Sequence, residues 1–244
     1  MGAVDIGTTV VVVLLAATVQ STTGFGFSLL AVPLLSLAIP TELAVVVAAT
    51  LGTLTSSAQA IGERAHGDRP TILRMLVGAA VGAPFGLLVL TVASNRQLKF
   101  GLAAVIFAFL IINLRGITIR RGSRAVDLVA GVVSGVLNTS LSTNGPPLVM
   151  ALHARHLAPR VFRGTISAVF AGTGVITLGL FLASGRFTTD ARELLMVAVP
   201  TMVIGYLIGS RIRPHIDPPR FRQAVMALLV ATAAVTLIGA LVAH

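Results

Sequence analysis

Two clusters of uncharged polar side chains stand inside apolar stretches of this 244-residue sequence. Serine, threonine, asparagine and glutamine offer hydroxyl and amide donors, and glycine lets a backbone approach a ligand closely. A helix that begins beside such a cluster directs free N–H groups and its positive dipole end at it, which favours anions. We therefore predict substrate binding here. The first cluster comprises Gln20, Ser21, Thr22, Thr23, Gly24 and Gly26, and the second comprises Asn138, Thr139, Ser142, Thr143, Asn144 and Gly145.

Prolines near these clusters predict where helices break or bend. A short helix should begin near Phe27, and Pro33 should leave the Leu29 carbonyl without its helical donor. Asn144 should cap a helix whose first positions are prolines that lack N–H groups, which shifts anion contact to side chains and the Gly145 N–H. The predicted breaks or hinges are Pro33, Pro84, Pro146, Pro147 and Pro200.

Each polar residue also has a purely structural interpretation. Serine and threonine in membrane helices often bond only to their own i−4 carbonyl, and glycines four apart often only permit close packing. We interpret Gly78, Gly82 and Gly86 as packing positions. Two clusters at corresponding positions of a duplicated chain favour a function.

The composition requires a membrane. Hydrophobic residues make up 55% of the chain and charged residues 11%, and the mean hydropathy is +0.96. Soluble domains carry roughly 25% charged residues. Most apolar runs approach the roughly 20 residues that a spanning helix needs, without the alternation of a membrane barrel. The sequence predicts an all-α integral membrane protein with segments at about 8–38, 41–61, 71–93, 97–114, 126–154, 161–184, 190–210 and 219–243.

These segments divide into two repeats of four, residues 1–122 and 123–244, which form one membrane domain. A shift of 118 residues places Gln20-Ser21-Thr22 on Asn138-Thr139-Ser140, an amide and two hydroxyls in both halves. The first segment of each half is interrupted by its polar cluster. We expect pieces of roughly 8–13 residues there, too short to span but suited to broken or re-entrant helices.

The positive charges favour re-entrant first segments. If all eight segments cross, Lys and Arg divide 9 to 9 between the two sides. If the first and fifth re-enter, 14 lie on one side and 4 on the other, as the positive-inside rule expects. Each half then crosses three times, so the repeats are inverted, the breaks meet near the midplane, and both termini lie outside the cytoplasm.

Several other classes of protein are excluded. The formal charge of +10 lies mostly in loops, so we expect no nucleic-acid binding. The chain has no cysteine, and we expect neither a metal nor a cofactor. No carboxylate lies near the middle of a segment, which disfavours a buried proton relay. With no HExxH motif, P-loop or paired intramembrane aspartates, an enzyme is not expected.

At both breaks the chain resembles the TauE/SafE sulfite exporter family, also called TSUP transporters. The resemblance lies in Gln20–Leu35 (QSTTGFGFSLLAVPLL) and Gly131–His153 (GVVSGVLNTSLSTNGPPLVMALH), followed by Arg163 and Phe170 in RGTISAVF. It implies a transporter, often an exporter, of sulfite, sulfonates or related anions in the bacterial inner membrane. Its partners would be a small anion and the lipid bilayer.

Two other functions remain open from the residues alone. The clusters could bind a carboxylate, or a cation through freed carbonyl oxygens. The chain could also be a membrane protein that assembles a complex and transports nothing.

Overall fold

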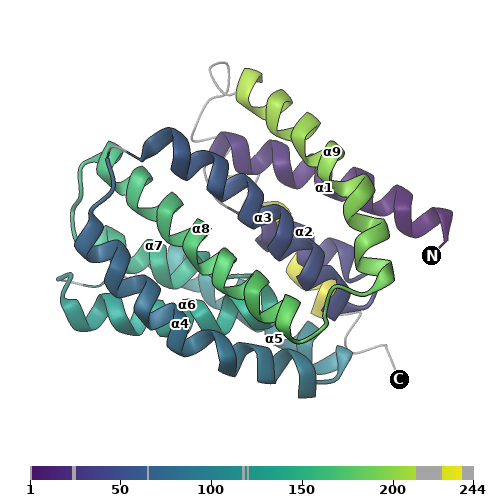
Figure 1. Cartoon of the computed structure of the whole chain (residues 1–244), viewed down its shortest axis with the longest axis horizontal. Coiled ribbons are helices and arrows are strands. Elements are labelled where there is room, and N and C mark those ends of the chain that lie inside the picture. The colour runs from purple at the N-terminus through teal and green to yellow at the C-terminus, as the bar shows by residue number, and fades with distance from the viewer. Residues whose placement is uncertain are drawn as a thin grey trace. The chain divides into compact units, whose positions relative to one another are not determined.

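The computed structural model describes residues 2–23, 26–64, 66–116, 119, 121–212 and 227–237, and all regular structure in these ranges is helical (Figure 1). The all-α prediction is thus confirmed for them. The helices are α1 Ala3–Thr23, α2 Phe27–Leu35, α3 Thr41–Glu63, α4 Arg69–Val92, α5 Asn95–Leu114, α6 Arg124–Leu141, α7 Gly145–His153, α8 Pro159–Ala183, α9 Thr189–Ile212, and a further helix Ala227–Leu237.

Six of the described helices are long and apolar enough to cross a membrane. Their mean hydropathies lie between 1.5 and 2.1. Neither α6 nor α7 is among them, although α1 is. The six candidate spans are Val4–Thr22, Thr41–Glu63, Arg69–Val92, Asn95–Ile112, Pro159–Ala183 and Thr189–Ile212.

The helices before the breaks are longer than the sequence predicted. Instead of pieces of roughly 8–13 residues, α1 has 21 residues and α6 has 18. The polar residues extend these helices because their hydroxyls bond to carbonyls of the preceding turn. Ser21 and Thr22 both donate to the Thr18 carbonyl, and Ser140 donates to Val136. The interruption therefore begins only after Thr23 and after Leu141.

The chain forms two compact units, and each unit combines segments from both sequence halves. The first contains Met1–Leu51, Ala93–Ile111 and Phe187–His244, and the second contains Gly52–Val92 and Ile112–Arg186. In the first unit α1 packs against α9 and α2, and in the second α6 packs against α4, α7 and α8. The repeats at 1–122 and 123–244 stay a prediction about sequence duplication.

Glycines bring α4 and α6 into backbone contact in the second unit. A Cβ added at Gly78 or Gly82 would lie within 3.0 Å of a carbonyl oxygen of α6, that of Leu128 or Val132. In return, a Cβ at Gly131 would meet the Met75 carbonyl of α4. The contacts advance together along both helices, so α4 and α6 run parallel. Close packing was the predicted role of the glycines in α4.

Glycines also bring α1 and α9 into backbone contact in the first unit. A Cβ at Gly205 would lie within 3.0 Å of the Leu14 carbonyl oxygen, and a Cβ at Gly209 would meet Thr18 and Ser21. The Thr18 hydroxyl donates to the Gly205 carbonyl at 3.1 Å, which adds an interhelical hydrogen bond. In both units, therefore, glycines of one sequence half admit the backbone of a helix from the other half.

Candidate functional site

The second cluster forms a sharp break between α6 and α7. Ser142 adopts the left-handed conformation, with φ 55° and ψ 26°, and its N–H donates to the Asn138 carbonyl at 2.9 Å. The Thr143 N–H donates back to Leu137 at 3.2 Å, which closes the end of α6. Asn144 occupies the N-cap position of α7 as predicted, but its side chain makes no capping hydrogen bond. The chain thus ends one helix and begins another within three residues.

One buried donor at this break has no partner in the part of the chain that the structure describes. The Thr143 side chain is 1% exposed, and its hydroxyl has no hydrogen-bond partner among the described residues. Two prolines follow Gly145, so the free N–H groups at the start of α7 reduce to those of Asn144 and Gly145. A buried hydroxyl without a partner is costly, and a ligand that accepts a hydrogen bond would remove that cost.

The α6 residues of the cluster bind α8 instead. The Asn138 amide donates to the Thr177 hydroxyl at 2.7 Å and to the Thr173 carbonyl at 3.4 Å. The Thr139 hydroxyl shares a 2.9 Å hydrogen bond with the same Thr177 hydroxyl. The structure therefore brings α8 to the second cluster. The sequence signal for this was the pair of threonines four residues apart in an apolar segment, which we had not considered.

A further buried hydroxyl on α6 also escaped prediction. Ser134 is fully buried, and its hydroxyl has no partner in the described part of the chain. It lies one helical turn before Asn138 on the same face of α6. Ser134 was not among the residues predicted to bind substrate.

The first cluster is only partly described. Gln20 and Ser21 are buried, and Gly26 precedes α2 with φ 98°, a backbone conformation that favours glycine. The helix begins at Phe27, as predicted. Gly24 and the side chain of Thr23 lie outside the described residues. The expected role of this cluster in substrate binding stays a prediction.

The predicted prolines occupy two kinds of position. Pro33 lies inside the nine-residue helix α2, Pro84 inside α4 and Pro200 inside α9, where each removes one backbone donor. Pro146 and Pro147 stand at the start of α7, where a missing N–H costs no helical hydrogen bond. Their role as hinges stays a prediction.

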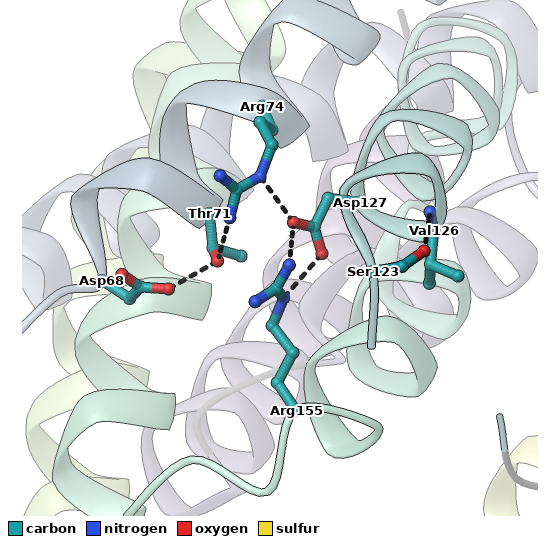
Figure 2. Close-up of polar contacts among 7 residues, drawn as sticks. All are labelled: Asp68, Thr71, Arg74, Ser123, Val126, Asp127 and Arg155. Atoms are coloured by element: carbon teal, nitrogen blue, oxygen red, sulfur yellow. Dashed lines mark hydrogen bonds and ion pairs between the residues drawn. The ribbon is translucent and has the colours of Figure 1, made fainter. Parts of the chain in front are cut away.

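A cluster of three charged side chains around a buried carboxylate lies at the start of α6 (Figure 2). The carboxylate of Asp127 is 0% exposed and lies between the guanidinium groups of Arg74 and Arg155. Arg74 Nε donates to it at 2.8 Å from α4, and Arg155 Nε donates at 2.8 Å from the turn after α7. The bond to Asp127 raises the pKa of Arg155, although burial opposes the shift. We call Arg74, Asp127 and Arg155 the charge clamp.

The sequence did not reveal the charge clamp. Arg155 was explained chiefly by membrane orientation, with attraction of anions to the cytoplasmic mouth as a second role. Asp127 was placed at the end of a segment, where water is usually near. A segment end can nevertheless be buried by another loop, here by the turn that carries Arg155. The Gly122 N–H also donates to the Ala154 carbonyl at 2.9 Å, which joins this turn to the start of α6.

Metal binding finds no support in the described ranges. They contain no group of three or more His, Asp or Glu residues that could hold an ion.

The fold and the break define a class of protein: a multi-pass helical membrane protein with a polar helix interruption, a construction typical of membrane carriers. Comparison with known families makes this specific. The family model for the sulfite exporter TauE/SafE matches residues 9–236, and the chain belongs to that family. It is therefore a membrane transporter and not an enzyme, as predicted.

Two relatives carry similar descriptions. The chain is 26% identical over 230 residues to the "Probable sulfite/organosulfonate exporter TauE" of Cupriavidus necator, covering 91% of this chain and 90% of the relative. It is 28% identical over 166 residues to the "Probable inner membrane transporter protein TsaS" of Comamonas testosteroni, covering 65% and 67%. No solved structure matches the chain. The family and six candidate spans make this a multi-pass inner-membrane protein.

Proposed function

We propose that the protein exports a small sulfur-containing oxyanion, such as sulfite or a sulfonate, and binds it at the break between α6 and α7. The observation that carries this proposal is the Thr143 hydroxyl, which is buried beside the start of α7 and has no hydrogen-bond partner among the described residues. The N–H groups of Asn144 and Gly145 add donors at the same point. The proposal that the anion contains sulfur rests on the relatives, one of which is named for sulfite and organosulfonates.

The neutral donors of this break suit a carrier that must release its substrate. An anion held in a buried ion pair would leave an uncompensated charge when it departs, at a cost of about 3–5 kcal/mol. Hydroxyls and N–H groups bind an oxyanion through several weaker contacts. An inside-negative potential of about 100 mV favours anion exit by about 2.3 kcal/mol per charge, so export needs no coupling ion.

We further propose that α6 and α7 form a re-entrant hairpin whose two ends lie at the cytoplasmic face. Its support is the Gly122–Ala154 hydrogen bond and the Arg155–Asp127 pair, which join the residues before α6 to the residues after α7. The loop before α4 also reaches α8, because the Asp68 N–H donates to the Thr165 hydroxyl at 2.9 Å. These loops lie on the side that holds 14 of the 18 Lys and Arg residues if the first and fifth segments re-enter.

The lack of cysteine makes this topology directly testable by single-cysteine labelling. Arg121 and Arg160 are exposed on either side of the hairpin. A membrane-impermeant thiol reagent should modify Arg121→Cys and Arg160→Cys from the cytoplasmic side only. Labelling of the two positions from opposite sides would exclude the hairpin.

The inverted repeats, the extracytoplasmic termini, alternating access and the participation of Gln20–Gly26 belong to the same proposal. Their support is the sequence duplication, the charge asymmetry and the left-handed Gly26 before α2.

Uptake of labelled sulfite into proteoliposomes tests the proposed function, with thiosulfate, sulfate and taurine as competitors. Thr143→Val keeps the side-chain shape and removes one donor to an anion, worth about 1.5–3 kcal/mol, so KM should rise about 10- to 150-fold. Thr201→Val is the matched control, because the hydroxyl of that buried threonine already donates to the Val197 carbonyl of its own helix. Its KM should stay unchanged.

An equal KM for Thr143→Val and wild type would refute the proposal that the anion binds at this break. Saturable uptake that only a carboxylate inhibits would assign another solute. No uptake above empty liposomes, under either sign of potential, would refute sulfite transport and favour an assembly role.

A further inference from the structure

The glycine contacts between α4 and α6 do not by themselves define the register of the two helices, that is, their alignment along the helix axes. Gly78, Gly82 and Gly86 recur every four residues and face the carbonyls of Leu128, Val132 and Val136, which recur with the same period. If α6 moved by one turn, Gly78 and Gly82 would face Val132 and Val136, the carbonyls that the next glycines face now. The backbone contacts would be largely regained after a slide of about 6 Å.

The charge clamp has no such periodicity. Asp127 is the one acidic residue in α6 and Arg74 the one basic residue in α4 beyond its first position. Their pair is the one ion pair between these helices in the residues that the structure describes. A slide of one turn would move the carboxylate by about 6 Å along the helix axis, away from its present place beside the Arg74 guanidinium, and would break the hydrogen bond.

Arg74 is itself held in place. Its Nη2 donates to the Thr71 hydroxyl at 3.0 Å, and that hydroxyl donates to Asp68 (Figure 2). Thr71 is fully buried, so the guanidinium is fixed to its own helix before it meets Asp127. A prearranged guanidinium that meets a fully buried carboxylate discriminates strongly between one position of α6 and the next.

We propose that the charge clamp is a register lock: the Arg74–Asp127 pair selects one alignment of α6 against α4 out of the several that the glycines allow. Buried polar groups serve this purpose in coiled coils, where one polar contact selects the register at a cost in stability. The break at Ser142 continues from α6, so Arg74 and Asp127 act as positioning residues for it. That consequence rests on the proposed function, whereas the register lock itself does not.

Pulsed electron paramagnetic resonance on the full chain in lipid nanodiscs reads the register. Spin labels at Val92→Cys and Val129→Cys sit on exposed positions of α4 and α6, 75% and 61% exposed. In the present register Gly78 faces the Leu128 carbonyl and Gly131 faces the Met75 carbonyl, so Val129 is about level with Leu76. The labels are therefore separated by about 24 Å along the helix axes. Wild type with these labels should give one distance. Arg74→Gln should add a second population shifted by about 6 Å.

Arg74→Gln is chosen because Asp127 keeps Arg155 and does not become an unpaired buried charge. Arg155→Gln is the matched control: it removes the other arm of the charge clamp, leaves Arg74–Asp127 intact, and should retain the single distance. If Arg74→Gln does not yield folded protein, Arg74→Gln with Asp127→Asn replaces the pair by neutral amides and should show the same shift.

One unchanged distance in the folded Arg74 variant would overturn the register lock, and so would an equal shift in Arg155→Gln. Sulfite uptake of the same samples separates this from the proposed function. A shifted distance in protein that transports no sulfite even as wild type would uphold the lock and refute the transport proposal. Sulfite uptake by the wild type, together with an unchanged distance in the Arg74 variant, would refute the register lock and uphold the transport proposal.

Discussion

The contact of Gly82 with α6 allows the helix packing to be tested with one added methyl group. A Cβ at this position would lie within 3.0 Å of both the carbonyl oxygen and the carbonyl carbon of Val132. Both are backbone atoms, so no side chain can rotate away. In Gly82→Ala the two helices must therefore move apart along the length of their contact.

The expected loss of stability follows from two opposing terms. Overpacking a close contact costs about 1–3 kcal/mol. Alanine in place of glycine also favours the helix by about 1 kcal/mol, which hides part of that cost. Gly179→Ala in α8 gives the same helical gain without the clash, because an added Cβ there meets no atom of the described residues within 4 Å. The difference between the two variants isolates the packing term of about 1–3 kcal/mol, or about 5- to 150-fold in the unfolding equilibrium.

Reversible unfolding in mixed micelles of increasing SDS content measures both variants against wild type. Gly82→Ala should unfold at lower SDS fraction than Gly179→Ala, and the free energies of unfolding should differ by the stated amount. Equal unfolding curves for the two variants would refute the backbone contact between α4 and α6, because the helical gain is common to both.

Two further substitutions test the breaks. Asn138→Leu should reduce the free energy of unfolding by no more than about 1.7 kcal/mol, since interhelical hydrogen bonds in membranes are weak and Thr139 still bonds to Thr177; a larger loss in the same SDS titration would contradict this. Gly26→Ala should cost about 1–2 kcal/mol from its positive φ alone, since no atom of the described residues lies within 4 Å of the added Cβ. Gly7→Ala, equally open but helical, is its control and should not lose stability.

The position of the second break could be predicted closely from the sequence, but the length of the helix before it could not. The run of prolines after Asn144 requires a new helix start, and α7 begins there. The length of the preceding helix could not be inferred from polarity, because a serine such as Ser140 can satisfy its hydroxyl within its own helix. Polar residues in a membrane segment therefore predict only the approximate position of the break, whereas proline and glycine predict the residue at which the new helix begins.

The binding partners of individual side chains were not predictable. Asn138 was expected to face a ligand, and it donates to Thr177, 39 residues away in the sequence. Thr143, five residues later, keeps its hydroxyl without a partner in the described residues. Both are buried polar residues of one cluster, and nothing local distinguishes them. Their difference depends on which residues of the cluster the tertiary structure places next to α8.

What the sequence by itself determined is the class of the molecule. Apolar runs of about twenty residues must become helices in a membrane, because each backbone N–H and carbonyl must be bonded within its own segment. Proline and left-handed glycine positions are equally local, and so were the helix starts at Phe27 and Gly145. Only the tertiary structure decided that Asp127 is buried between Arg74 and Arg155. Ion pairing depends on which distant segments come within about 4 Å, and the spacing of charges along a chain does not contain that distance.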